Sequence, residues 1–446
     1  MNNKYLLDTI TNLLPIKELQ SKSNGEVFTD PIIIEEMLDK LPIHLFKNKD
    51  LKWFDPAVGV GNFIVLLLFR LKLHLLDQFN TEKECITYIL SNMIYACELN
   101  KDNCNIYREL FKGYSINLYE GDTLTFNCYQ EFGLKEFDII LGNPPFNSGG
   151  IHSCHGHKLS TTVKNRTIWP LFVRLSFELL KENGYLLFIT PLSWLRKTHP
   201  VFDLILGYNL IWLKIVDTIN TKKLLKVSTS TSFYLVQKSN IISNTSITSL
   251  IKNNVYNYNG MLNKNYNIPL AYFSIFEKLY KFKEKYNCPI ESRSIGVVSL
   301  GNKLKITDNY TKQDNLVLDT ITLKDGILTR VGTKIHKDHH KRKLMFCSKS
   351  FLTSHIDDGR LSISGRGHDF YILCNGNGNI ELIQHITKFK LFNTINILSK
   401  YRMCFKERYI LDLVPDLSIF GYNTNITEQE FYNIIGLTND EINSLF

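Results

Sequence analysis

The stretch Asp138-Ile-Ile-Leu-Gly-Asn-Pro-Pro-Phe146 is the most informative part of this 446-residue chain. An apolar run typical of a buried strand leads directly into the turn Asn143–Phe146. Its two prolines remove two backbone donors and disfavour helical geometry in the residue before each of them. The segment therefore predicts a rigid turn at the carboxyl end of a strand, the position where open α/β sheets bind ligands.

Such a turn would present two hydrogen-bond acceptors and a stacking surface in fixed geometry. The acceptors are the Asn143 amide and the Pro144 carbonyl, and the surface is the Phe146 ring. This combination suits a planar base that bears an amino group. Taken alone, the turn fits equally well a structural cap on a strand, because proline is common in turns.

Strand-like and helix-like segments alternate around this turn, from residue 51 to residue 240. Helices are predicted at Gly61–Leu76, Lys101–Phe111 and Ile168–Glu182. Strands are predicted at Trp53–Val58, Met93–Glu98, Asn117–Gly121, Asp138–Gly142, Tyr185–Thr190, Leu210–Val216 and Ser232–Gln237. The alternation predicts an α/β fold with a mostly parallel, seven-stranded sheet. The last two strands suit a hairpin, which would make one strand antiparallel.

A second motif, Phe54-Asp-Pro-Ala-Val-Gly-Val-Gly-Asn-Phe63, predicts a strand, a glycine turn and the start of a helix. Glycines allow the backbone to approach a ligand, and a helix start offers free N–H groups. The motif lacks the third glycine of a dinucleotide-binding loop. Asp55 would repel a phosphate and attract a cationic amino or sulfonium group.

Two further acidic residues follow the next strands. Glu98 is placed to bind ribose hydroxyls, and Asp122 is placed for an adenine amino group. Glu98 lies 43 residues after Asp55, roughly twice the usual spacing, which implies an inserted helix. Three acids at successive strand ends indicate a nucleoside cofactor without a pyrophosphate, and the charge favours S-adenosylmethionine (SAM) over NAD.

In this order, the motifs resemble the N6-adenine DNA methyltransferases, a family of amino-methyltransferases. Gly25–Pro31 resembles the segment that this family places over the cofactor. Its position ahead of the glycine loop, with a long C-terminal region, is typical of the gamma class, which includes modification enzymes of type II restriction systems. Gly184–Pro191 with Trp194, and the tail Ile426–Ile442, also resemble the family. Residues 241–410 match no part of it that we can name.

The resemblance implies a Rossmann-like SAM-dependent methyltransferase that acts on N6 of an adenine flipped out of double-stranded DNA. The implied catalytic residues are Asn143, Pro144, Pro145 and Phe146. The implied cofactor-binding residues are Phe28, Thr29, Asp55, Pro56, Gly59, Gly61, Glu98, Asp122 and Asn143. Two positions depart from many relatives: Phe146 stands where they have Tyr, and Thr123 where a bulky apolar residue packs on the cofactor ring.

Positive charge is concentrated in the C-terminal half. Residues 1–240 carry 26 Lys and Arg against 24 Asp and Glu, whereas residues 241–446 carry 26 against 19. This excess suits a polyanionic partner. The candidate DNA contacts are Lys158, Lys164, Arg166, Lys334, Lys337, Lys341, Arg342 and Lys343, with a solvated surface as the alternative. A loop at 148–157 holds three His and one Cys, but they are too close together to predict a metal site.

Three regions are predicted: a catalytic domain at 1–240 with a helical N-terminal segment, an α+β target-recognition domain at 241–410, and a helical tail at 411–446. In the tail, Thr427 and Thr438 are candidate N-caps and Gly436 a stop. The composition is 44% hydrophobic and 21% charged, with no membrane-length apolar run or signal peptide, which favours a soluble intracellular protein. About 24 residues precede the cofactor-covering segment, so any restriction endonuclease partner is expected to be a separate chain.

Two alternatives stay open from the sequence. Turns of this kind also serve RNA adenine and protein glutamine methyltransferases. The basic C-terminal half argues against a protein substrate but does not exclude RNA. The chain could also be a nucleic-acid-binding protein that has lost catalysis, although the motif residues listed above are intact.

Overall fold

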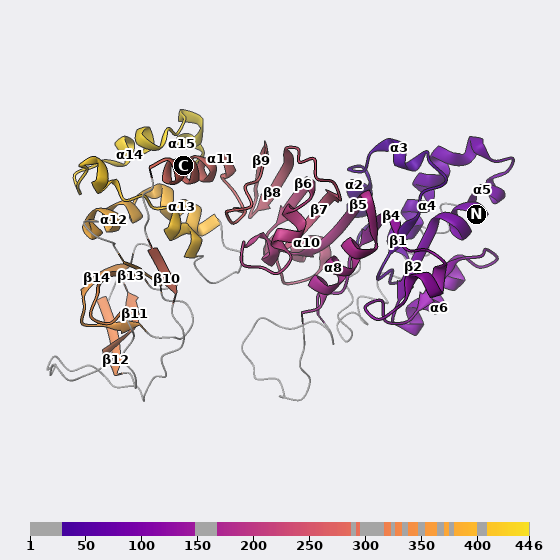
Figure 1. Ribbon diagram of the computed structural model, residues 1–446, viewed down its shortest axis with the longest axis horizontal. Coiled ribbons are helices and arrows are strands. Elements are labelled where there is room, and N and C mark those ends of the chain that lie inside the picture. The colour runs from indigo at the N-terminus through magenta and orange to yellow at the C-terminus, as the bar shows by residue number, and fades with distance from the viewer. Residues whose placement is uncertain are drawn as a thin grey trace. The chain divides into compact units, whose positions relative to one another are not determined.

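The computed structural model describes residues 29–147, 167–286, 291–294, 316–322, 326–331, 338–346, 353–363, 370–373, 379–398 and 408–445. The chain divides into two compact units, Met1–Ile268 and Pro269–Phe446 (Figure 1).

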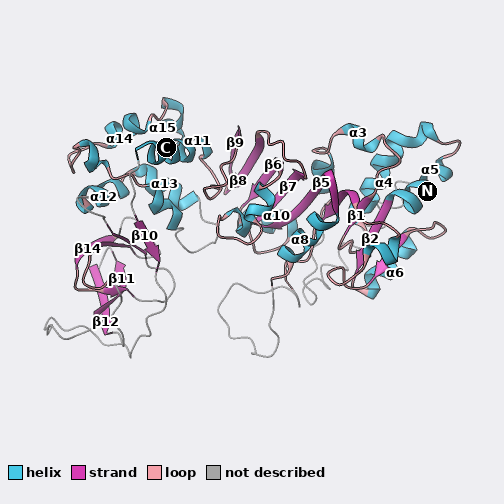
Figure 2. Cartoon of the chain, viewed as in Figure 1, coloured by secondary structure: helices cyan, strands magenta, loops and turns pink. Residues whose placement is uncertain are grey.

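The first unit is built on one sheet, which has nine strands in the part of the chain that the structure describes (Figure 2). Their order is β3-β2-β1-β4-β5-β7-β6-β8-β9. The strands are β1 (Trp53–Asp55), β2 (Ile94–Glu98), β3 (Asn117–Glu120), β4 (Phe137–Gly142), β5 (Leu180–Pro191), β6 (Asn209–Val216), β7 (Thr231–Gln237), β8 (Thr245–Ile251) and β9 (Asn254–Gly260).

Strand directions confirm the predicted mixed α/β fold with a mostly parallel sheet. Parallel pairs join β3 to β2, β2 to β1, β1 to β4 and β4 to β5. The antiparallel strand that the sequence predicts is β7, which lies between β5 and β6 and runs opposite to both. A helix, α10 (Thr218–Leu225), occupies the connection where only a hairpin was predicted.

The sheet extends beyond the seven predicted strands, and this corrects the predicted end of the first domain at residue 240. Strand β8 pairs in parallel with β6 and in antiparallel with β9. Only alternate residues of β8 are buried, among them Thr245, Ile247 and Ser249. Such a Ser- and Thr-rich strand near a sheet edge lacks a continuous apolar run. For this reason the predicted boundary fell before this strand.

Helices of the first unit pack around this sheet. They are α2 (Pro31–Leu38), α3 (Ile43–Phe46), α4 (Asn62–Leu75), α5 (Glu82–Tyr88), α6 (Lys101–Leu110), α7 (Cys128–Phe132), α8 (Trp169–Leu179), α9 (Phe202–Leu206) and α10, with shorter turns η1 (Leu76–Gln78), η2 (Ile89–Met93) and η3 (Leu192–Leu195). Helix α2 begins where the Asp30 carboxylate accepts a hydrogen bond from the Ile32 amide at 2.8 Å. Helix α4 is apolar nearly all round and is buried in the core beside β1.

The second unit combines two small sheets with helices, as the predicted α+β class requires. One sheet has the order β10-β16-β13-β14 and the other β12-β11-β15. The strands are β10 (Glu291–Ser294), β11 (Leu316–Thr322), β12 (Gly326–Val331), β13 (Arg342–Phe346), β14 (Ser354–Asp358), β15 (Ser362–Ile363) and β16 (Phe370–Leu373). The helices are α11 (Phe273–Tyr286), α12 (Ile380–Thr387), α13 (Lys390–Leu398), η4 (Arg408–Leu413), η5 (Leu417–Phe420), α14 (Glu428–Ile435) and α15 (Asn439–Ser444).

The two predicted tail helices are confirmed. Thr427 caps α14 and Thr438 caps α15, each in a reciprocal capping box with a glutamate three residues on. Gly436 ends α14 in a left-handed conformation. Across the described ranges, no helix is both long and apolar enough to cross a membrane.

Gly61, which precedes α4, gives a testable prediction. Its φ is +103°, and a β-carbon there would lie 2.9 Å from Cδ2 of Tyr107. We expect Gly61→Ala to lower the free energy of unfolding of the first unit by about 1–3 kcal/mol, because both the backbone and Tyr107 would be strained. Tryptophan fluorescence during denaturation reports this unit, since all four tryptophans lie before residue 269.

The matched control is Gly133→Ala. Gly133 also has a positive φ, +69°, but a β-carbon there would meet nothing within 4 Å. Equal destabilisation by the two substitutions would contradict the clash with Tyr107.

Candidate active site

The predicted site residues of four strands gather at one edge of the sheet. Asp55 ends β1, Glu98 ends β2, Asn143 directly follows β4, and Asp122 lies two residues beyond β3. Because β1 pairs in parallel with both β2 and β4, the ends of these strands are neighbours. This is the edge at which open α/β sheets bind ligands.

The glycine loop is held against the neighbouring strand ends by hydrogen bonds. Glu98 Oε2 accepts from the Gly59 amide at 2.8 Å, and its Oε1 accepts from the Asn100 amide at 2.7 Å. On the other side, the Thr123 hydroxyl donates to the Pro56 carbonyl at 2.6 Å. Thr123 is buried, so this departure from the family pattern links two loops of the site.

Asp55 is a buried carboxyl group, with only 1% of its surface exposed. The Ala57 amide donates to its Oδ1 at 3.0 Å, and it lies so close to Gly142 that a β-carbon there would come within 2.7 Å of Oδ1. Desolvation raises the pKa of Asp55 to about 8, and the charge of Glu98 adds to the rise. The site therefore holds a carboxyl group whose ionisation a cation would favour.

The Asn143-Pro-Pro-Phe turn leaves one acceptor unused. Asn143 Nδ2 donates to the Thr29 hydroxyl at 3.2 Å, while Asn143 Oδ1 is buried and has no hydrogen-bond partner in the described structure. Pro144 is buried and Pro145 is half-buried. Phe146 is partly buried against the core, and its carbonyl accepts from the Ile168 amide at 3.1 Å.

The last two predicted cofactor-binding residues are Asp122 and Phe28. Asp122 is exposed, and its Oδ1 accepts from the Leu124 amide at 3.0 Å. Phe28 lies outside the described residues.

Two other residues of the site did not emerge from the sequence. Gly142 has no side chain, which leaves room for the Asp55 carboxyl group beside the turn. Asn62 donates through Nδ2 to the Thr29 carbonyl at 3.1 Å. The signals were a glycine directly before the Asn-Pro-Pro turn and a single polar residue at the start of an apolar helix.

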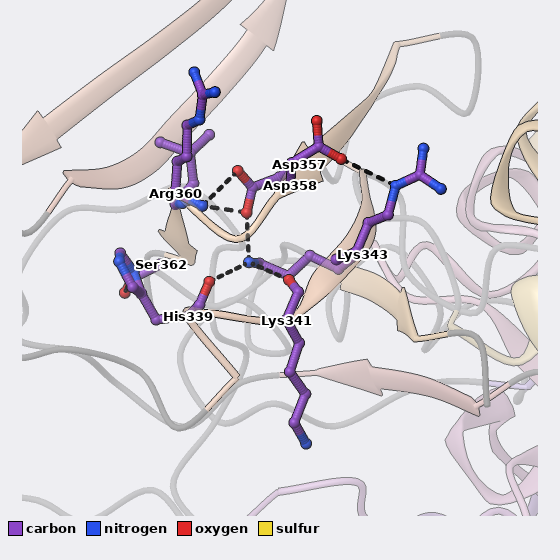
Figure 3. Close-up of polar contacts among 9 residues, drawn as sticks. His339, Lys341, Lys343, Asp357, Asp358, Arg360 and Ser362 are labelled. Atoms are coloured by element: carbon purple, nitrogen blue, oxygen red, sulfur yellow. Dashed lines mark hydrogen bonds and ion pairs between the residues drawn. The ribbon is translucent and has the colours of Figure 1, made fainter. Parts of the chain in front are cut away.

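Among the candidate DNA contacts, Lys343 requires a correction, because its side chain is fully buried. Its ammonium group bonds to Asp357 Oδ2 at 2.5 Å, the His339 carbonyl at 3.0 Å and the Lys341 carbonyl at 3.1 Å (Figure 3). Desolvation lowers the pKa of Lys343, and the bond to Asp357 opposes this. Lys343 therefore holds β13 to β14 and does not present its charge to a phosphate.

The neighbouring candidates are exposed but paired. Lys341 forms an ion pair with Asp338 at 2.8 Å, and Arg342 pairs with Asp358 at 3.0 Å and with Glu381. Lys158, Lys164, Arg166, Lys334 and Lys337 lie outside the described residues, as does the loop with three His and one Cys. In the part that the structure covers, no group of three or more His, Cys, Asp or Glu could hold a metal ion.

Comparison with known proteins bears on the predicted family. Residues 63–224 match the model of the Eco57I restriction-modification methylase family. Over 259 residues the chain is 21% identical to an uncharacterised adenine-specific methylase of Mycoplasma pneumoniae, an alignment that covers 42% of this chain and 60% of that protein. The predicted resemblance to N6-adenine methyltransferases of restriction-modification systems is confirmed.

A shorter match, 32% identical over 73 residues, is to the type II methyltransferase M.TthHB8I of Thermus thermophilus. It covers 14% of this chain and 17% of that enzyme, so the chain spans less than two thirds of either curated relative.

Solved structures of restriction-modification enzymes are also similar. The type ISP enzyme LlaBIII bound to DNA has a TM-score of 0.48 at 12% identity, covering 83% of this chain and 36% of that one. The EcoKI M protein has a TM-score of 0.36 at 18% identity, covering 50% and 48%. These TM-scores lie below 0.5, so neither structure bears on function.

The raised pKa of Asp55 predicts a pH dependence of stability. The folded state keeps the carboxyl protonated up to about pH 8, whereas the unfolded chain ionises it near 3.8. The protonated Asp55 therefore contributes fully to stability below its pKa in the unfolded chain. This contribution is lost as the pH rises through its pKa in the folded protein. Asp55→Asn should therefore unfold at a less pH-dependent temperature than the wild type between about pH 4 and pH 8, measured by tryptophan fluorescence. Parallel curves for the two proteins would contradict the buried, protonated Asp55.

The buried ion pair of the second unit predicts a large effect of one substitution. Lys343→Met would leave the Asp357 carboxylate buried without its cation, and we expect a loss of about 3–5 kcal/mol. Calorimetry of the full chain would follow the second unit, while tryptophan fluorescence follows the first. Lys281→Met is the control, because Lys281 and its partner Glu277 on α11 are both exposed, at 70% and 42%, and this pair should contribute little. Equal effects of the two substitutions would contradict the structural role of Lys343.

Proposed function

We propose that the chain is a SAM-dependent DNA methyltransferase that modifies N6 of adenine within a specific sequence, as part of a restriction-modification system. The single observation that carries the proposal is the unused acceptor Asn143 Oδ1, held in the Asn-Pro-Pro-Phe turn beside Asp55 and the glycine loop. The family match supports it independently, since it covers Glu98, Asp122 and the turn.

The residues at the sheet edge fit SAM by their chemistry. SAM, when bound, supplies a methyl group carried on a sulfonium. Asp55, desolvated and without a cation partner among the described contacts, suits the positively charged methionine part. Gly59 has open space where a β-carbon would lie, and Gly61 follows in the same loop. Glu98 has oxygens for ribose hydroxyls, and Asp122 suits the adenine amino group.

The turn would act on the target adenine by positioning and electrostatics. Asn143 Oδ1 and the Pro144 carbonyl accept hydrogen bonds from the amino group, which directs the nitrogen lone pair toward the methyl group. These acceptors also stabilise the positive charge that develops on nitrogen. Phe146 would stack on the base, which must leave the duplex to reach the turn.

The second unit would read the target sequence. Its support is indirect: residues 241–446 carry a net positive charge, and Lys341 and Arg342 remain exposed although each has an acidic partner. A separate restriction endonuclease would complete the system.

The test is transfer of labelled methyl from SAM to unmethylated duplex DNA, run beside RNA of the same sequence. Label on adenine N6 of DNA is expected. Asn143→Ala should lower the rate by at least about 100-fold, since the developing charge loses an acceptor. Asn254→Ala, at an exposed position of β9, is the control. Label on RNA alone would overturn the DNA substrate, and no label on either despite SAM binding would contradict methylation of nucleic acid.

A further inference from the structure

Thr29 joins two asparagines of the site, Asn62 and Asn143. Its hydroxyl accepts from Asn143 Nδ2 at 3.2 Å, and its backbone carbonyl accepts from Asn62 Nδ2 at 3.1 Å. Thr29 is 4% exposed and lies directly before Asp30, the N-cap of α2. Asn62 is the first residue of α4, so three separate parts of the chain meet at this threonine.

Both asparagines use their amide nitrogen on Thr29 and leave their amide oxygen unpaired. Asn62 Oδ1 and Asn143 Oδ1 are buried without a hydrogen-bond partner in the described structure. A buried acceptor without a partner destabilises the folded state. Each amide therefore points its nitrogen at Thr29 and leaves its oxygen unpaired. This arrangement is unfavourable for folding, so we look for its reason in the function of the site.

We propose that Thr29 is a positioning residue, whose hydroxyl orients the Asn143 amide so that Oδ1 faces the adenine amino group. This inference rests on the proposed function. An asparagine side chain presents either an acceptor or a donor, depending on the rotation of its amide. Only the acceptor can bind an amino group, because the NH₂ of the amide would repel it.

The hydroxyl matters in the productive orientation because it accepts the hydrogen bond of Asn143 Nδ2. With valine at position 29, a methyl group of the same shape would face Nδ2, and this donor would lose its partner when Oδ1 points to the base. Valine therefore removes the hydrogen bond that holds the Asn143 amide in place with Nδ2 on residue 29 and Oδ1 toward the base. Asn62 supports the arrangement by holding the Thr29 backbone.

This role differs from that of a residue that only covers the cofactor. A covering residue would change SAM affinity, whereas a positioning residue changes the rate at saturating SAM and DNA. Thr29→Val should lower kcat by about 10- to 100-fold, the range that misplacement of a reacting group produces. The Kd for SAM, measured by calorimetry without DNA, should stay within about threefold of the wild type.

Three further variants make the test specific. Thr29→Ser keeps the hydroxyl and should restore kcat to within about threefold, whereas Thr29→Ala should resemble Thr29→Val. Thr221→Val is the matched control. Thr221, in α10, is fully buried, and its hydroxyl donates to the carbonyl of Val216, the last residue of β6, at 3.2 Å. This variant should leave kcat unchanged. Tryptophan fluorescence verifies folding of each protein.

The outcomes separate this inference from the proposed function. If the wild type methylates DNA and Thr29→Val has the same kcat, or loses only SAM affinity, Thr29 does not position Asn143. If serine fails to restore kcat, the hydroxyl is not responsible. If the wild type transfers no methyl group to DNA, the proposed function fails and this inference fails with it.

Discussion

The hydrogen bonds of the Glu98 carboxylate set the geometry of the candidate active site. One oxygen accepts from the Gly59 amide and the other from the Asn100 amide, so the end of β2 holds both the glycine loop and the start of α6. The Gly121 amide donates to the Glu98 carbonyl at 2.9 Å, which adds the loop after β3. One residue thus ties three loops together, and Asp55, Pro56 and Gly61 depend on the position of these loops.

The site contains buried polar groups that lower the stability of the folded first unit. A carboxyl group is buried at Asp55, and two amide oxygens are buried at Asn62 and Asn143 without partners in the described structure. The large apolar core around β1 and α4 supplies the stability that offsets them. Buried groups of this kind are expected where a ligand completes the hydrogen bonds and the charge balance.

In the second unit, burial and ion pairing decide which basic residues can contact DNA. Lys341, Arg342 and Lys343 were all predicted to contact DNA, yet Lys343 is enclosed by Asp357 and two backbone carbonyls. Lys341 and Arg342 remain at the surface but bind Asp338, Asp358 and Glu381. Asp357, Asp358 and Glu381 lie later in the chain than these basic residues, so composition alone could not assign them as partners.

The sequence by itself determined where the seven central strands lie along the chain, the turn at Asn143 and the acids at the strand ends. It could do so because these features are local: each depends on a short apolar run and the polar or glycine residues that end it. Only the tertiary structure decided that β8 and β9 join the sheet, that Thr29 binds Asn62 and Asn143, and that Lys343 is structural. These contacts join residues far apart along the chain, and their energies depend on burial, which a single sequence does not specify.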